Sequence, residues 1–343
     1  MKPRELRAAR ALGPARRTYS CLEGTRKKPS DYQITSTALL YYPARGFEVD
    51  TPVWRHYERY QRQGQLRSER WDELEDPAHF TYSTYVAERR DQEAFLDRLL
   101  ERPVAPVPPE LRPLLGLLSA LRFPLHALQM VAAYVGALAP SGRITIAATF
   151  QAADELRRIQ RLCQWLARSG IPVAQLDAIG REHWQQSPEF QPLRRLLERL
   201  LSTYDWGEAL VALNGVIKPV LDRLWFEQLV GVAERCRDEV LEKILSSLGD
   251  DARWHEAWFV ELSRLALDSD PGNRAALQRD VAEFRPLLTQ SVQALLPAFG
   301  RLFGDEGTRA YVWRELDTAL HAHLERAGLV DGRREEARDG QPR

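Results

Sequence analysis

The sequence contains little cysteine and no surplus of either charge. Its 343 residues include three cysteines, Cys21, Cys163 and Cys236, which lie far apart and form no Cys-x-x-Cys pair. This spacing excludes a disulfide scaffold and a zinc ribbon, and it is typical of a protein in the reducing cytoplasm. Lys and Arg number 48, as do Asp and Glu, so the overall charge does not favour nucleic-acid binding.

Long apolar runs are also scarce. The longest, from Leu114 to Ala139, is interrupted by Arg122, Pro124 and His126, and we interpret it as a buried helix and not as a membrane span. The first twenty residues are rich in arginine but lack the apolar core of a secretory signal. Strands do not alternate with helices along the chain, which excludes a Rossmann sheet.

Familiar catalytic motifs are absent, including the P-loop, GxSxG, GxGxxG and HExxH. A di-iron bundle of the ferritin type uses Glu-x-x-His, because this spacing places both ligands on one helix face. No histidine here has a Glu three residues before it; Asp76 precedes His79, but Pro77 lies between them and indicates a loop. His321 and His323 lie on nearly opposite sides of a helix. The sequence therefore predicts no catalytic residue, bound cofactor or metal in this chain.

The first part of the chain differs in composition from the rest. Residues 1–87 mix Pro, Gly and many aromatic residues without a helical period, and residues 1–28 carry nine Lys or Arg. So many aromatic residues in an aperiodic segment predict an extended arm that packs against a partner subunit. Helical periodicity dominates residues 88–328, and the polar tail, 329–343, is predicted to be disordered.

Apolar spacing, together with Pro and Gly at the breaks, predicts a series of helices. They cover residues 88–101, 110–138, 143–169, 190–203, 205–247, 251–268, 274–303 and 306–327. Ser141 and Asp250 are expected to cap two of them. Long helices in two pairs are typical of a ferritin-like bundle, so we predict an all-α, ferritin-like fold. A helical solenoid would require a repeat of fixed period, which the chain lacks.

The predicted helix 143–169 contains charges on both of its faces. Glu155 falls inside the apolar stripe of the helical wheel and Arg158 lies at its edge, so they form either a buried pair or a simple i, i+3 surface pair. Asp154, Arg157 and Arg161 are expected on the opposite, solvated side. The residues of the apolar stripe are Ala148, Ala152, Leu156, Ile159, Leu162, Cys163 and Leu166.

Two segments resemble the Asp-Glu-x-Arg-His motif of bacterial multicomponent di-iron monooxygenases. The segment Asp154-Glu155-Leu-Arg-Arg158 has Arg158 at the histidine position, and Asp251-Ala252-Arg-Trp-His255 has Ala252 at the glutamate position. The rest of the chain, from about residue 16 to 300, resembles the β subunit of these hydroxylases, the paralogue of the iron-bearing α subunit. The resemblance is nearest to the toluene (aromatic) and alkene monooxygenases. The matching stretches are 17–32, 36–37, 41–42, 47–50, 71–85, 125–130, 205–209 and 218–219.

The resemblance implies a ferritin-like β subunit without iron of its own in an (αβγ)₂ hydroxylase. Such a complex works with a small effector protein, a ferredoxin and an NADH-dependent reductase, and its di-iron centre lies in the α subunit. It would insert O₂-derived oxygen into an aromatic or alkene hydrocarbon, and the aromatic arm would lie across the α subunit. Vestiges of the ligand positions would be Glu155, Arg158, Glu208, Ala252 and His255.

Two other functions stay open from the sequence alone. An enzyme with its own metal site would need ligands that the histidine spacing does not supply, and metal analysis of the isolated chain would detect it. A helical adaptor or nucleic-acid-binding protein would use the basic arm. The neutral overall charge counts against that alternative, and a salt-sensitive shift of DNA would support it.

Overall fold

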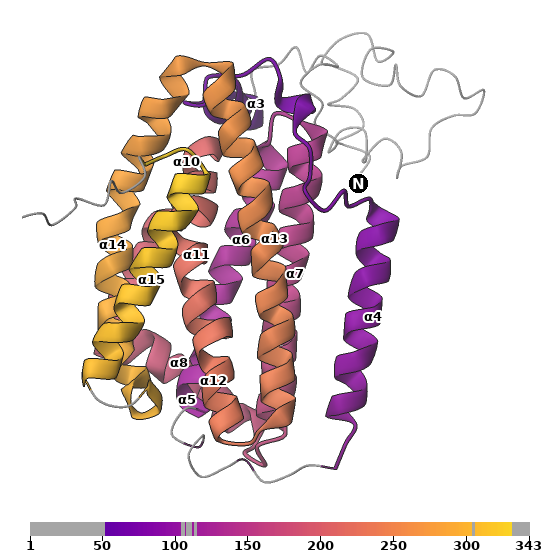
Figure 1. Cartoon of the computed structure of the whole chain (residues 1–343), viewed down its shortest axis with the longest axis vertical. Helices are drawn as coiled ribbons and strands as arrows, with labels where there is room; N and C mark the ends of the chain where they lie inside the picture. The colour runs from indigo at the N-terminus through magenta and orange to yellow at the C-terminus, as the bar shows by residue number, and fades with distance from the viewer. Residues whose placement is uncertain (1–51, 104–106, 108–111, 113–114, 304–305, 331–343) are drawn as a thin grey trace, which may run out of the picture. The chain divides into compact units, whose positions relative to one another are not determined.

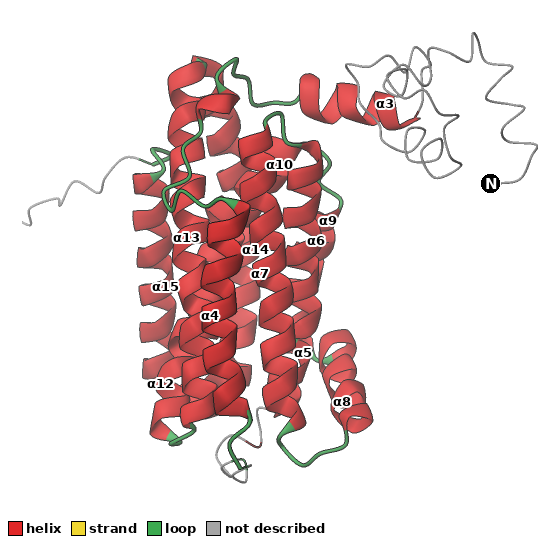
Figure 2. Ribbon diagram, turned by 90° about the vertical axis from the view of Figure 1, so that its right-hand side faces the viewer, coloured by secondary structure: helices red, strands yellow, loops and turns green. Residues whose placement is uncertain are grey.

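The computed structural model describes residues 52–103, 107, 112, 115–303 and 306–330. Every regular element in these ranges is a helix (Figure 2), which confirms the all-α prediction. The chain divides into two compact units after Glu58. The described part of the first unit forms α3 (Pro52–Tyr57). Most of the predicted arm and of the predicted tail lies outside the described residues.

The second unit is a bundle of long helices that run along one another (Figure 1). Its α-helices are α4 (Tyr82–Leu100), α5 (Leu115–Ala120), α6 (Arg122–Leu138), α7 (Gly142–Ala167), α8 (Val173–Gln186), α9 (Gln191–Leu201), α10 (Trp206–Leu210), α11 (Lys218–Asp222), α12 (Gln228–Arg235), α13 (Glu239–Ser269), α14 (Pro271–Phe303) and α15 (Glu306–Arg326). Short 3₁₀ and π turns are η3 (Glu58–Arg62), η4 (Trp71–Glu73), η6 (Pro188–Phe190), η7 (Val211–Ile217) and η8 (Arg223–Glu227).

The core of the bundle lies between α7, α13 and the segment from α10 to α12. Helix α6 packs along α7, α13 packs on α7 and α12, and α14 packs on α9 and η7. Large aromatic side chains fill the interior, and burial of each one stabilises the fold by about 2–3 kcal/mol. Those that are almost completely buried include Trp206, Trp225, Trp258, Phe226 and Phe259.

Capping groups decide where two of the helices begin. Ser141 caps α7 by accepting a hydrogen bond from the Arg143 N–H at 3.2 Å, which confirms the predicted cap. Helix α4 begins at Tyr82 and not at residue 88, because Thr81 and Thr84 form a reciprocal capping box. The predicted boundary between arm and bundle, at 87/88, therefore falls inside a helix.

The break expected between the predicted helices 205–247 and 251–268, at Gly249, and the expected cap at Asp250 are both wrong. Helix α13 runs without interruption from Glu239 to Ser269, and Asp250 lies on its exposed side, paired with Arg253. A glycine costs a helix only about 1 kcal/mol relative to alanine, which packing against α7 and α12 exceeds.

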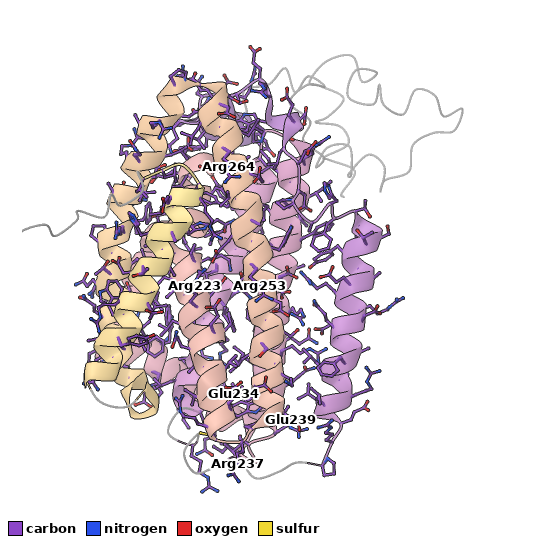
Figure 3. The ribbon with its side chains drawn as sticks, in the orientation of Figure 1. Arg223, Glu234, Arg237, Glu239, Arg253 and Arg264 are labelled. Carbon is purple, nitrogen blue, oxygen red and sulfur yellow. The ribbon has the colours of Figure 1, made fainter. Side chains whose placement is uncertain are left out.

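The chain breaks instead between α12 and α13. Arg237 adopts a left-handed φ of 58°, and Asp238 caps α13 by accepting from the Leu241 N–H at 2.9 Å. Figure 3 shows Glu234, Arg237 and Glu239 gathered at this turn. A left-handed arginine carries no compositional signal, so the sequence analysis missed this break and assigned one at Gly249 instead.

Three further boundaries differ from the predictions. The segment 110–138 holds two helices, α5 and α6, and the unpredicted helix α8 follows α7. Leu329, the first residue of the predicted tail, is buried, and its N–H donates to the Leu324 carbonyl at 2.9 Å. Among the described residues, Leu115–Leu138 alone has the length and hydropathy of a membrane span. Within it, 72% of the apolar 18-residue window is buried inside the bundle.

The packing of α8 on α5 depends on Gly180. A Cβ at this position would lie 2.6 Å from Ser119 Oγ and 2.8 Å from its carbonyl oxygen, which is backbone and cannot turn away. We expect Gly180→Ala to lower the free energy of unfolding by about 1–3 kcal/mol despite the better helix propensity of alanine. At Gly142, where a Cβ meets nothing within 4 Å, the same substitution should cost nothing. Urea unfolding of both variants measures the difference, and equal stabilities would contradict the clash.

Candidate functional site

Helix α7 presents charged side chains to the interior of the bundle. Asp154, Glu155 and Arg158 have 0% exposure, and Arg157 and Arg161 are also buried. The expected solvated side for Asp154, Arg157 and Arg161 is therefore wrong, because ion partners on α4 and α13 cover them.

The predicted apolar stripe of α7 is confirmed only in part: Ala148, Ala152, Leu162 and Leu166 are buried. Leu156, which was placed inside the stripe, is 50% exposed, and Cys163 is exposed as well. The helical wheel assumes that apolar residues face inward. Here the buried ion pairs determine the rotation of the helix instead.

Glu155 and Asp222 share two cations at the centre of the bundle. Arg158 Nη1 donates to Glu155 Oε1 at 3.0 Å and to Asp222 Oδ1 at 2.8 Å. Lys218 Nζ donates to Glu155 and pairs with Asp222 at 3.0 Å. All four side chains are at most 4% exposed, so two carboxylates and two cations neutralise one another in a dry environment.

Further contacts fix the Arg158 guanidinium in this position. Its Nη2 donates to the Leu248 carbonyl at 3.2 Å, and its Cζ lies over the Phe226 ring, 4.6 Å from the ring centroid. Burial alone would raise the pKa of the Asp222 carboxyl, but the charges of Arg158 and Lys218 hold that pKa below its ordinary value. The Asp222 carboxyl therefore remains ionised near neutral pH.

Lys218 and Asp222 come from α11, one turn of α-helix between the π turns η7 and η8. The spacing of four residues places both on one side of the helix. Gly215 in η7 packs against the Phe259 ring, where an added Cβ would lie 2.8 Å from Cζ. This close approach lets η7 and the following α11 pack against α13.

A second part of the network surrounds Asp154. Its Oδ1 accepts from Tyr85 Oη and from Arg89 Nε, each at 2.8 Å, and its Oδ2 lies 3.1 Å from His255 Nε2. Burial raises the pKa of the Asp154 carboxyl, but the His255 hydrogen bond and Arg89 together lower it well below its ordinary range. Burial and the charge of Lys218 lower the pKa of His255 to about 4. The imidazole is therefore neutral at pH 7 and donates through Nε2.

Asp251 completes the network from α13. Its Oδ2 accepts from Arg157 Nη1 at 2.7 Å, and its Oδ1 lies 3.2 Å from Arg89 Nη1. Burial and the neighbouring charge of Asp154 raise the pKa of Asp251. The network, as we define it, contains four carboxylates (Asp154, Glu155, Asp222, Asp251), four cations (Arg89, Arg157, Arg158, Lys218) and His255. With His255 neutral and all four carboxylates ionised, its formal charges sum to zero.

These residues do not fit a pair of metal ions. A di-iron centre requires carboxylate and imidazole lone pairs that converge on the ions. Here Arg158 and Lys218 occupy the carboxylates of Glu155 and Asp222, and His255 Nε2 points at Asp154. In the described part of the chain, no group of three or more His, Cys, Asp or Glu could hold an ion.

Comparison with known proteins relates this bundle to oxygenases. The model of the methane, phenol and alkene hydroxylase family matches residues 46–270. The hydroxylase component subunit β of the toluene-4-monooxygenase system of Ectopseudomonas mendocina is 32% identical over 82% of this chain and 89% of its own length. The chain is a β subunit of this hydroxylase family.

Other similar proteins are also oxygenase components or oxygenase structures. The oxygenase component DmpL of phenol 2-monooxygenase from Pseudomonas sp. (strain CF600) is 26% identical over 93% of this chain and 96% of its own. The structure of toluene 4-monooxygenase with toluene in its resting active site matches with a TM-score of 0.70 and 31% identity, covering 79% of this chain and 94% of that one. Phenol hydroxylase from Pseudomonas sp. OX1, at 19% identity and TM-score 0.66, shares the fold. The matches support the hydroxylase subunit and not the adaptor alternative.

The structure brings together only some of the positions that the resemblance implies are vestiges of metal ligands. Glu155, Arg158 and His255 belong to the network, and Ala252 is buried one turn before His255. Glu208 does not join them. It is partly exposed and accepts from Arg199 Nη2 at 2.9 Å, in a separate group with Glu283.

Sequence reasoning missed Lys218 and Asp222 as members of the network. Lys218 lies in a segment that resembles the family, and the i, i+4 spacing of a lysine and an aspartate is a visible signal. It also missed Asp251 and Arg89, whose partners lie on other helices.

The buried pair can be tested with a double-mutant cycle. Arg158→Leu leaves two carboxylates against one cation in a dry core, and we expect a loss of about 3–5 kcal/mol. Adding Glu155→Gln restores neutrality around Lys218 and Asp222 and should recover much of that loss. The exposed pair Arg194–Glu198, 2.8 Å apart on α9, serves as control, with coupling of about 0.5 kcal/mol or less. Additive effects at 155 and 158 in urea unfolding would contradict the network.

His255 should make the free energy of unfolding depend on pH. Its pKa is about 4 in the folded chain and 6.5 as the ordinary value, so between these pH values the unfolded chain binds more protons. The contribution of His255 is complete above pH 6.5 and is lost as the pH falls towards 4. His255→Gln keeps a donor to Asp154 but cannot be protonated. The advantage of the wild type should therefore shrink by up to about 3 kcal/mol between pH 7 and pH 4; a constant difference in urea unfolding would refute this.

Proposed function

We propose that this chain is the non-catalytic scaffold of an (αβγ)₂ hydroxylase whose α subunit holds the di-iron centre. The observation that carries the proposal is the neutral ion network, in which Arg158 and Lys218 occupy the carboxylates that metal ions would need. Two cations at the centre would repel a dication strongly in so dry a site. The network instead ties α4, α7, α11 and α13 together by charge-assisted hydrogen bonds.

The complex would oxidise an aromatic or alkene hydrocarbon with electrons from NADH. The similar subunits are named for toluene, phenol and propane monooxygenases. A reductase, a ferredoxin and a small effector protein would act with the hydroxylase, in the cytoplasm. The predicted arm of residues 1–87 is not wholly available to a partner, because Trp71 and Tyr85 pack on Trp206 and Phe150 of the chain's own bundle. The remaining aromatic residues of the arm would add contacts with the α subunit, because aromatic side chains and arginine are enriched in interface cores.

Reconstitution tests the proposed function. The purified chain with NADH, reductase, ferredoxin and effector should not oxidise toluene, whereas addition of the α and γ subunits should give hydroxylated product. Iron should be found with the α subunit when the complex is resolved. Turnover by this chain alone, or about two iron atoms bound per isolated chain, would overturn the proposal.

A further inference from the structure

The outer face of α6 and α7 is uncharged over most of its length. On these two fully described helices, no Asp, Glu, Lys or Arg is exposed at positions 123–138 or 144–167. The exposed fractions are 45% for Met130, 49% for Ile146 and 50% for Leu156. The other exposed residues of this face include His126, Ala133, Thr149, Ala153, Gln160 and Cys163.

The two helices form one continuous surface. They pack along each other, and a Cβ at Gly136 of α6 would lie 3.3 Å from Oγ1 of the exposed Thr149 on α7. Elsewhere the bundle carries ordinary surface charge: Figure 3 labels Arg223, Arg253 and Arg264 on the face formed by η8 and α13. We call the uncharged surface the α6–α7 face.

The ion network prevents α7 from turning this face inward. A rotation that buried Leu156 would expose Glu155 or Arg158 and break pairs to Asp222 and Lys218. Breaking one side of a buried ion pair costs about 3–5 kcal/mol, whereas burying a leucine side chain contributes only about 2–3 kcal/mol. The apolar face therefore stays on the outside of the isolated chain.

We propose that the α6–α7 face binds a helical, apolar surface of the α subunit as a permanent interface. This inference rests on the proposed function. Interfaces of permanent complexes are more apolar, whereas transient electron-transfer contacts are small and depend on charge to steer the encounter. An uncharged face fits the α subunit and does not suit a ferredoxin or reductase.

Size and shape support a helical partner. Ile146 and Cys163 are separated by about 26 Å along α7 at 1.5 Å per residue. With α6 about 9 Å away, the face covers on the order of 500 Å², more than half of the ~800 Å² per partner in a standard interface. The small side chains of Ala133, Thr149 and Ala153 line its middle and allow another helix to approach closely.

Charge substitution in the co-expressed complex tests the interface. Leu156→Glu and Ile146→Glu change exposed side chains, so each variant should keep the helicity and unfolding midpoint of the wild-type chain. A carboxylate buried at the interface should weaken association with the α subunit at least about 30-fold. Val173→Glu, at a site on α8 that is 68% exposed, is the matched control and should assemble normally.

Cys163 provides a second readout, because it is exposed on the same face. Its alkylation by maleimide, mapped by peptide mass spectrometry with Cys236 as internal reference, should slow at least about tenfold in the assembled complex. Normal assembly of both glutamate variants with unprotected Cys163 would overturn this inference and leave the proposed function intact. Protection of Cys163 in the isolated chain, with a doubled mass, would also overturn it, by showing that a second copy covers the face. If the wild-type chain fails to associate with the α subunit, the proposed function itself fails.

Discussion

The ion network within the bundle is the constraint on which the remaining structure depends. Each of its carboxylates and cations would be costly to bury alone, and each is buried against a group of opposite charge. Its members come from α4, α7, α11 and α13, so these helices must have the correct depth and rotation at the same time. Mutual neutralisation thus does in this chain what metal ions and their ligands do in a di-iron bundle.

The rotation of α7 links this interior to the surface. Because Asp154, Glu155 and Arg158 face inward, Ile146 and Leu156 face outward. A helix with ions inside and apolar side chains outside is unfavourable for a protein that works alone. It suits the assembly proposed above, in which the α subunit covers the outer face and the buried ion pairs keep the helix fixed.

The fold class was predictable because helical periodicity is a local property that survives in most segments. Helix boundaries were predicted correctly where a capping side chain marks them, as Ser141 does at the start of α7. They failed where packing overrode propensity, as at Gly249, which remains helical, and at Arg237, which adopts a left-handed conformation. Helix α8 was missed because close packing on α5 stabilises it, and a local sequence pattern does not reveal such packing.

The sequence by itself determined the i, i+3 pair of Glu155 and Arg158 and the family resemblance around it. Only the tertiary structure decided that both are buried, that Lys218 and Asp222 share them, and that Glu208 belongs to a different group. It also reversed the predicted environment of Asp154 and Leu156. A helical wheel scores each residue by its own polarity, whereas the cost of burying a charge depends on partners some 60–100 residues away. Only folding brings those partners together.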